Sequence, residues 1–374
     1  MQRRLVGRYD VIVCGVLFAC GVGCTDALTD EGLAQKVETT LNAQQTAGEQ
    51  LFDNEKFKGN GRTCATCHTD STGTLSPRQI ENIFEDNPRA PLFRSIDADV
   101  VGGNTYHRLI NDATIRMTIP LPPNVSIVGS SARSVQLFRG ISSTLNTPAL
   151  QAVLMSDGRA PNLQAQAADA IASHFQPGRS PTASELDAIA AYEKTQFSSA
   201  QLLSFAAGGP APVMPLGRTA SEKRGRKFFV DDATTPAPRC VHCHSGPNLD
   251  TTSPGVQVAF GVPAGMKIFT AFVSQLRTGG GEVLTYEFRD AAGKVTTIQS
   301  PDPGRALITG NPADADLFKI PSLWNAKNTA PYFHNNGAKT INDLVNHYEQ
   351  MFLLFGFQLT TQEKADIAAY QKLL

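Results

Sequence analysis

The chain has little that would point to a charged partner or to disulfide bonds. Its 374 residues carry 33 basic and 34 acidic side chains, so a basic surface for nucleic acid is not expected. Of 7 cysteines, Cys14, Cys20 and Cys24 lie near the N-terminus, and the remainder form two C-x-x-C pairs. No cysteine is left over for a disulfide. In an exported chain, where disulfides are allowed, the paired thiols are expected to serve another purpose.

The apolar run near the N-terminus is too short to span a membrane comfortably as a mature helix. It covers about residues 11–23 and follows three arginines. We expect residues 1–24 to be an export signal and residues 25–46 to be a polar tether. Cys20 and Cys24 are candidates for lipid attachment, with Cys24 slightly favoured, and soluble release into the periplasm is the alternative.

Two segments share the pattern C-x-x-C-H, namely Cys64-Ala65-Thr66-Cys67-His68 and Cys240-Val241-His242-Cys243-His244. Two thiols at this spacing can each add to one vinyl group of a haem, and the following histidine is placed to ligate the iron. A thioredoxin-like redox pair and half of a zinc site also contain C-x-x-C, but neither explains the repeated histidine. The chain therefore predicts two c-type haems, ligated by His68 and His244.

Each motif lies between two predicted helices of similar sequence. Residues 48–52 precede the first motif and residues 225–229 precede the second, at positions that fit the N-terminal helix of a class I cytochrome c. Residues 184–192 and 360–370 have apolar residues at helical spacing, the former behind a serine cap with a glutamate beside it. This repetition predicts a mainly α protein of two tandem class I cytochrome c-like domains, each with one covalently bound haem.

The predicted domains are separated by a segment rich in proline and glycine, residues 206–217. The N-terminal domain is expected over residues 47–205 and the C-terminal domain over residues 218–374. Insertions at about 71–140 and 251–305 add loops to the two domains. In the second insertion, three consecutive glycines precede an alternating stretch, which predicts a small β-hairpin arm.

Further motifs carry a resemblance to a known family. Asp157-Gly158-Arg159 follows the first haem motif, and the segment Thr329-Ala330-Pro331-Tyr332-Phe333-His334-Asn335-Asn336-Gly337 follows the second. With the tandem haem motifs, they make residues 47–374 resemble the bacterial dihaem cytochrome c peroxidase superfamily, which includes MauG. The resemblance implies a peroxide-reactive haem in the N-terminal domain, an electron-entry haem in the C-terminal domain and a calcium ion between them.

The same resemblance indicates the second axial ligand of the electron-entry haem. In the superfamily this ligand lies fourteen residues after the histidine of the P-Y-x-H motif, and counting from His334 gives Tyr348. A tyrosinate stabilises ferric iron, which is typical of MauG-like proteins rather than of the ordinary peroxidases. Leu344, Tyr348 and Met351 share one face of a helix expected to begin at Thr340. Tyr348 is therefore also a candidate core residue, and Met351 is the rival ligand.

The reactive pocket departs from the family pattern. The resemblance places Gln166 in this pocket, but it puts Gln176 where the family has an acid-base glutamate. Because an amide cannot transfer a proton, His174 becomes the candidate acid-base group, with a surface histidine as the alternative. Ser156 stands where the peroxidases have a tryptophan between the haems. Trp324 is the candidate substitute relay, or else a packed core aromatic.

The resemblance also implies calcium ligands, at Asn146, Thr329 and Pro331, and amide and carbonyl oxygens suit this ion. Of the other histidines, we expect His107 to lie on a surface loop and His242 to face solvent. His334 is expected at a haem edge or at the domain interface, and His347 is expected to point away from Tyr348 on its helix.

These features predict an exported, periplasmic dihaem oxidoreductase. It is expected to reduce hydrogen peroxide at the N-terminal haem with electrons from the C-terminal haem, or to use peroxide to oxidise a protein substrate as MauG does. A small cytochrome c or a cupredoxin is the expected donor. Loss of the glutamate and of the tryptophan leaves open O2 chemistry, as in the rubber oxygenases, and pure electron transfer. The oligomeric state is also open, with a homodimer among the options.

Overall fold

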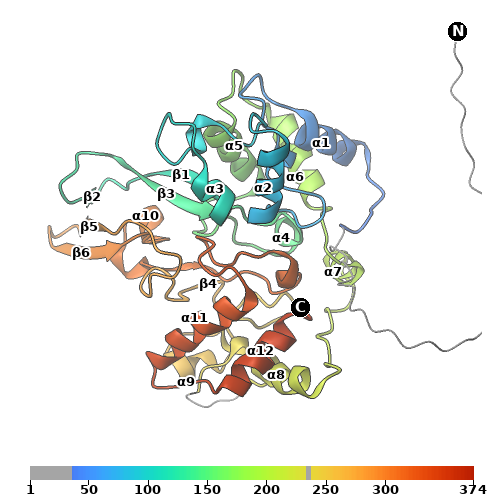
Figure 1. Ribbon diagram of the computed structural model, residues 1–374, viewed down its shortest axis with the longest axis vertical. Helices are drawn as coiled ribbons and strands as arrows, with labels where there is room; N and C mark the ends of the chain where they lie inside the picture. Colours follow the sequence, from blue (N-terminus) through green and yellow to red (C-terminus); the bar gives the residue numbers. More distant parts are fainter. Residues whose placement is uncertain (1–35, 233–236) are drawn as a thin grey trace, which may run out of the picture. The chain divides into compact units, whose positions relative to one another are not determined.

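The computed structural model describes residues 36–232 and 237–374, and helices predominate in it (Figure 1). In the first half they are α1 (Ala43–Asn54), α2 (Pro77–Asp86), α3 (His107–Asp112), α4 (Thr147–Leu150), α5 (Leu163–His174), α6 (Ala183–Glu193) and α7 (Ala200–Ala206). In the second half they are α8 (Ala220–Val230), α9 (Val256–Phe260), α10 (Ala306–Thr309), α11 (Ile341–Leu353) and α12 (Thr361–Gln371). The predicted export signal lies outside the described residues. No helix in the described ranges is long and apolar enough to cross a membrane.

Within the described residues, three small antiparallel sheets accompany the helices. Strand β1 (Thr114–Pro120) pairs with β3 (Ser134–Gly140), and β4 (Ile268–Phe269) pairs with β7 (Phe318–Lys319). The third sheet joins the two halves of the chain, because β2 (Val125–Ile127) pairs with β5 (Leu284–Arg289), which also pairs with β6 (Val295–Ser300). Strands β5 and β6 form the predicted hairpin arm. The two predicted insertions thus meet in one sheet, which the sequence did not indicate (Figure 1).

Two helices begin at other residues than the sequence predicted. Helix α6 begins after Thr182, whose side chain accepts a hydrogen bond from the backbone N–H of Glu185, so the predicted cap at Ser184 is wrong. Thr360 and Glu363 form the same reciprocal capping box at α12. Helix α1 already starts at Ala43, inside the expected tether, because Asn42 and Gln45 also form a capping box.

An equivalent pair of helices brackets each C-x-x-C-H segment. Helix α1 packs against α6 in the first half, and α8 packs against α12 in the second, as predicted. A glycine permits each close approach: a methyl group at Gly48 would lie 2.0 Å from the carbonyl oxygen of Ala188, and one at Gly225 would lie 1.9 Å from that of Asp366. Any larger side chain at either glycine would push the two helices apart.

Aromatic contacts repeat at these crossings. The rings of Phe52 and Tyr192 are 5.4 Å apart, and those of Phe229 and Tyr370 are 5.1 Å apart. Both tyrosines are at most 2% exposed, so each crossing ends in a buried aromatic pair. These pairs fix the C-terminal ends of α6 and α12 relative to the helices that precede the haem motifs.

Candidate haem sites

The first C-x-x-C-H segment lies in a short 3-10 helix, Cys64–Thr66, and opens onto a cavity. Cys64, Cys67 and His68 all line this space, which we call the first cavity. Nδ1 of His68 lies 2.8 Å from the backbone oxygen of Gly73. With Nδ1 donating to that carbonyl, Nε2 is the free nitrogen. A histidine held in this way has the tautomer and the fixed ring orientation of an iron ligand.

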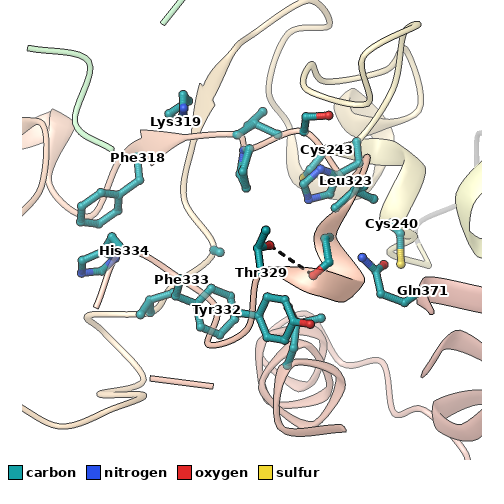
Figure 2. A pocket seen from close by; sticks show the side chains of 18 of the residues that line it. Cys240, Cys243, Phe318, Lys319, Leu323, Thr329, Tyr332, Phe333, His334 and Gln371 are labelled. Atoms are coloured by element: carbon teal, nitrogen blue, oxygen red, sulfur yellow. Dashed lines mark hydrogen bonds between the residues drawn. The ribbon is translucent and has the colours of Figure 1, made fainter. Parts of the chain in front are cut away.

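The second segment repeats this arrangement at the 3-10 helix Cys240–His242. Cys240, Cys243 and His244 line the second cavity, and Nδ1 of His244 lies 3.0 Å from the backbone oxygen of Leu249 (Figure 2). The carbonyl follows its histidine by five positions in both copies. Both segments therefore present two thiols and one imidazole to a cavity, which is the donor set that a c-type haem requires.

The chemistry of the thiols separates this interpretation from a redox pair. None of the four cysteines in the described ranges is in a disulfide. Burial raises the pKa of Cys67 to about 11 and those of Cys240 and Cys243 to about 12, and it also raises the pKa of Cys64. Thiols with such pKa values are protonated at neutral pH, whereas catalytic C-x-x-C pairs depend on a thiolate. The residues present fit covalent haem better than disulfide exchange.

The two cavities share a wall. It consists of residues 140–143 with Thr147, Ser156 and Lys319, which line both spaces. The backbone N–H of Lys319 donates to the oxygen of Ser156 at 2.7 Å, so the second half of the chain is bonded directly to the segment before Asp157. Trp324 is not part of this wall. It lines the second cavity, and its indole N–H donates to the oxygen of Pro247 at 2.9 Å.

Both candidate axial ligands line the second cavity. Leu344, Tyr348 and Met351 on α11 face it together, as their spacing predicts. No hydrogen bond to the hydroxyl of Tyr348 is found within the described parts of the chain, and burial raises the pKa of this phenol. The side chain is thus free to meet a ligand in the cavity. The choice between Tyr348 and Met351 stays a prediction.

His347 anchors α11 on its other side. Its Nε2 donates to the oxygen of Ala271 at 2.6 Å, and its Nδ1 accepts from the hydroxyl of Thr278 at 2.6 Å. His347 does not line the cavity, in agreement with the prediction that it points away from Tyr348. Its two hydrogen bonds attach the helix to residues 271–278, which restricts rotation of the helix at Tyr348.

The structure brings the predicted distal residues together in the first cavity. Gln166 and His174, both on α5, line it with His68. Burial lowers the pKa of His174, so its imidazole is neutral at pH 7. Gln176 is exposed and has a left-handed backbone with φ of 48°. Glu193, at the end of α6, also lines the first cavity, although sequence reasoning did not single it out.

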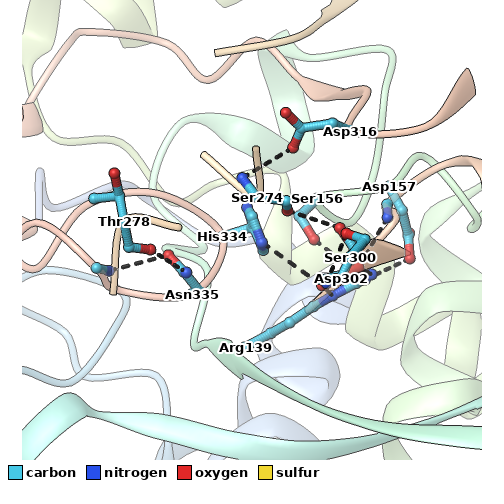
Figure 3. A network of polar contacts seen from close by, with 12 residues as sticks. Arg139, Ser156, Asp157, Ser274, Thr278, Ser300, Asp302, Asp316, His334 and Asn335 are labelled. Atoms are coloured by element: carbon cyan, nitrogen blue, oxygen red, sulfur yellow. Dashed lines mark hydrogen bonds and ion pairs between the residues drawn. The ribbon is translucent and has the colours of Figure 1, made fainter. Parts of the chain in front are cut away.

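A buried ionic cluster next to the shared wall was not expected from the sequence (Figure 3). The guanidinium of Arg139 donates to Asp302 at 2.8 and 3.0 Å and to Asp157 at 2.5 Å. Nε2 of His334 lies 3.6 Å from Oδ2 of Asp302, and its ring stacks on Phe318 with the ring centroids 3.8 Å apart. Burial lowers the pKa of His334 to about 4. Two members carried a signal in the sequence, Asp157 in the D-G-R motif and His334 in the P-Y-x-H motif. Arg139 and Asp302 had none, because nothing in either local sequence announces the other.

The predicted calcium residues Asn146, Thr329 and Pro331 all line the second cavity. The side-chain oxygen of Asn146 accepts from the backbone N–H of Ser198 at 2.9 Å, and its amide donates to the hydroxyl of Ser198 at 2.8 Å. In the ranges that the structure describes, no group of three or more His, Cys, Asp or Glu side chains is arranged for a metal ion. The calcium site therefore stays a prediction.

Two further histidines can be placed. His107 is exposed, as expected, but it is the first residue of helix α3 and does not lie in a loop. The prediction for His242 is wrong, because this residue is 0% exposed. Its Nδ1 accepts a hydrogen bond from the backbone N–H of Arg239 at 3.2 Å. The residue is buried because the 3-10 turn that presents the cysteines folds this side chain inward, where it makes a ring contact with Phe260.

Comparison with known proteins identifies the relatives of the chain, although no protein-family model matches it. A cytochrome c peroxidase of Pseudomonas sp. (strain SCT) is 29% identical over 193 residues, which are 49% of this chain and 47% of that protein. Cytochrome c551 peroxidase of Nitrosomonas europaea is 37% identical over 76 residues, 20% of this chain and 22% of that protein. The matched part thus spans about half the length of the first relative and less of the second.

Among solved structures, a MauG-like protein associated with microbial copper homeostasis is 17% identical and has a TM-score of 0.49, with 94% of this chain and 95% of that chain covered. The sequence relatives are both peroxidases named for cytochrome c. These two relatives confirm the resemblance to the dihaem cytochrome c peroxidase superfamily.

Proposed function

We propose that this chain is an exported dihaem oxidoreductase built from two tandem cytochrome c-type domains. The observation that carries the proposal is the repeated donor set: in each half, two buried thiols and a histidine held through Nδ1 line one cavity. The repeated helix pairs α1–α6 and α8–α12 support the two-domain organisation. The cytochrome c peroxidase relatives support an enzyme rather than a carrier.

We assign peroxide reduction to the first cavity. A haem held by Cys64, Cys67 and His68 would supply an iron that binds hydrogen peroxide and takes up its oxidising equivalents. The chain contributes Gln166 and His174 to the lining of the same cavity. Because His174 is neutral, it can accept a proton from one oxygen of bound peroxide and return it to the departing oxygen. The amide of Gln166 can orient the peroxide by hydrogen bonding but cannot transfer a proton.

Electron entry is assigned to the second cavity. Tyr348 is the proposed second axial ligand beside His244, since it lines the cavity and no hydrogen bond to its hydroxyl is found in the described ranges. Trp324 is the proposed relay. Its place on the second cavity suits transfer into that haem more than transfer across the shared wall. The donor would be a small cytochrome c or a cupredoxin, or a side chain of a protein substrate as for MauG.

The remaining parts of the proposal concern calcium and location. Asn146, Thr329 and Pro331 would provide oxygen ligands for a calcium ion, of the amide and carbonyl type that this cation accepts. We place the mature protein in the periplasm, either released or held by lipid at Cys20 or Cys24. These positions precede the described residues, so the anchor depends on the sequence pattern alone.

Spectroscopy and turnover of the full chain, matured in a host that attaches c-type haem, test this function. We expect two covalent haems, a high-spin ferric component from the first cavity, and peroxide-dependent oxidation of a reduced small cytochrome. Purely low-spin spectra with no reaction toward peroxide would instead show an electron carrier. Oxygen binding by the reduced protein, without any peroxide reaction, would favour the oxygenase alternative.

The ligand assignment has its own matched pair of variants. Tyr348→Phe is expected to change the low-spin EPR signal of the ferric protein, whereas Met351→Leu, one helical turn further along the same face, is expected to leave it unchanged. If only the Met351→Leu variant altered the signal, Met351 would be the ligand and the proposal for Tyr348 would fail.

A further inference from the structure

Lys319 is a cationic residue on the wall between the two cavities. It follows Phe318 at the end of strand β7 and lines both spaces (Figure 2). Its ammonium group donates to the side-chain oxygen of Gln151 at 3.0 Å. Within the described residues, no carboxylate forms an ion pair with it. Burial lowers the pKa of Lys319 to about 8. An enclosed ammonium of this kind is stabilised when an anion lies beside it.

The neighbouring cations already have anionic partners. Among the described residues, the lysine and arginine side chains that line the second cavity are Arg239 and Lys319. Arg239 directly precedes Cys240 and pairs with Asp231 at 3.3 Å. Arg139, on the other side of the wall, lies between Asp157 and Asp302. Lys319 is therefore the cation in the second cavity that remains available to a bound anion.

The geometry of a c-type haem determines where its own anions lie. Thioether bonds form at the vinyl groups, and the two carboxylate side chains project from the opposite edge of the porphyrin. Figure 2 shows Cys240 and Cys243 at one end of the second cavity and Lys319, Phe318 and His334 at the other. A haem attached to these cysteines with its iron at His244 would direct its carboxylate edge toward Lys319.

We propose that Lys319 binds a carboxylate of the haem in the second cavity, at the wall shared with the first. The inference rests on the proposed function, because it requires haem attachment at Cys240 and Cys243. Gln151 orients the ammonium group. Its amide nitrogen donates to Asp250 at 3.4 Å, which directs the carbonyl oxygen toward Lys319. The lysine thereby places a positive charge near both irons and favours their reduced forms.

Redox titration of the mature protein tests this inference. The variants are Lys319→Met and Lys319→Gln, which remove the charge, Lys319→Arg, which keeps it, and Lys267→Met. Lys267 is the control lysine, because it pairs at 3.1 Å with Asp250, the carboxylate that Gln151 contacts, but lines neither cavity. We expect about tenfold less ferrous second haem at a fixed potential in both neutral variants, which corresponds to a fall of about 59 mV for a one-electron couple. The first haem should shift in the same direction by less.

A second readout reports the contact itself. Resonance Raman bands of the haem carboxylate bending modes should shift in Lys319→Met and stay in place in Lys267→Met. Unchanged potentials and bands in both neutral variants, with both haems attached, would overturn this inference alone. An equal fall in the reduction potential of the second haem in Lys267→Met would also overturn it, since loss of any nearby positive charge would then have the same effect. Absence of covalent haem from the wild-type chain would overturn the proposed function as well.

Discussion

The two cavities have the same residues at the proposed haem-attachment segment. They differ in the residue that the C-terminal end of α6 or α12 contributes to the lining. Each has the same thiols, the same histidine and the same carbonyl acceptor five positions later. At the end of the helix, Tyr192 is followed by Glu193, whereas Tyr370 is followed by Gln371. Glu193 lines the first cavity and Gln371 lines the second. The buried tyrosine is therefore the same in both halves, whereas the next residue, which lines the cavity, is a carboxylic acid in the first half and an amide in the second.

This difference shows which parts of the repeat are structural. The tyrosines contact Phe52 and Phe229 and hold the helices together, so they are required in both halves. The next position does not hold the helices. In the first cavity it places a carboxyl whose Oε2 has no hydrogen-bond partner, and burial raises its pKa to about 8. The amide in the second cavity cannot ionise, so the two cavities differ in their response to pH.

The strongest test of the comparison removes one attachment site at a time. Cys64→Ala with Cys67→Ala should leave one covalent haem and abolish peroxide consumption, because the reactive site is assigned to the first cavity. Cys240→Ala with Cys243→Ala should also leave one haem, but this protein should still bind peroxide once, without turnover. Mass spectrometry counts the haems and stopped-flow absorbance follows peroxide. Peroxide binding in the first variant and none in the second would reverse the assignment.

The next test breaks the ionic link beside the shared wall. Arg139→Met leaves Asp157 and Asp302 buried without their main cation, so the free energy of unfolding should fall by about 3–5 kcal/mol. Lys339→Met, which removes a solvent-exposed pair with Asp112, should change it little. Denaturant titration at neutral pH measures both. Equal losses in the two variants would mean that the buried cluster contributes no more than a surface pair.

A smaller effect is expected for the proposed acid-base group. His174→Gln should slow peroxide turnover about 100-fold, because a glutamine fills a similar volume but cannot carry the proton. His107→Gln is the control, since His107 is exposed on α3 and lines neither cavity. Steady-state rates and their pH profile distinguish the two. A normal rate in His174→Gln would assign the proton transfer to another group.

The pH response of the two helix ends gives the mildest test. The raised pKa of Glu193 means that the folded state holds a proton which the unfolded state releases. The contribution of Glu193 to the free energy of unfolding should therefore be full below about pH 4.5 and should fall by about 1.4 kcal/mol per pH unit between about pH 5 and pH 8. Glu193→Gln should remove this slope, and Gln371→Glu should introduce a second one. Urea titrations across this range measure it, and an unchanged slope in Glu193→Gln would assign it to other groups.

Local sequence signals were sufficient to predict the bracketing helices and to single out the two C-x-x-C-H segments that line the cavities. A C-x-x-C-H segment is complete within five residues, and the helices carry apolar residues at a regular spacing. The cap of α6 and the burial of His242 were mispredicted because they depend on where a turn closes. Arg139, Asp302 and Lys319 could not be predicted as neighbours of the cavities, because each is brought there by segments that pair across the chain.

The ion pair between Arg139 and Asp302 has a consequence for modularity. These residues are 163 positions apart, on opposite sides of the predicted linker. A cut at that linker would leave Arg139 with Asp157 in one fragment and would leave Asp302 buried without its guanidinium partner in the other. It would also remove β2 from its partner β5. Neither half is therefore a portable single-haem unit. Although the sequence has the pattern of a tandem duplication, we expect that neither half folds or takes up haem without the other.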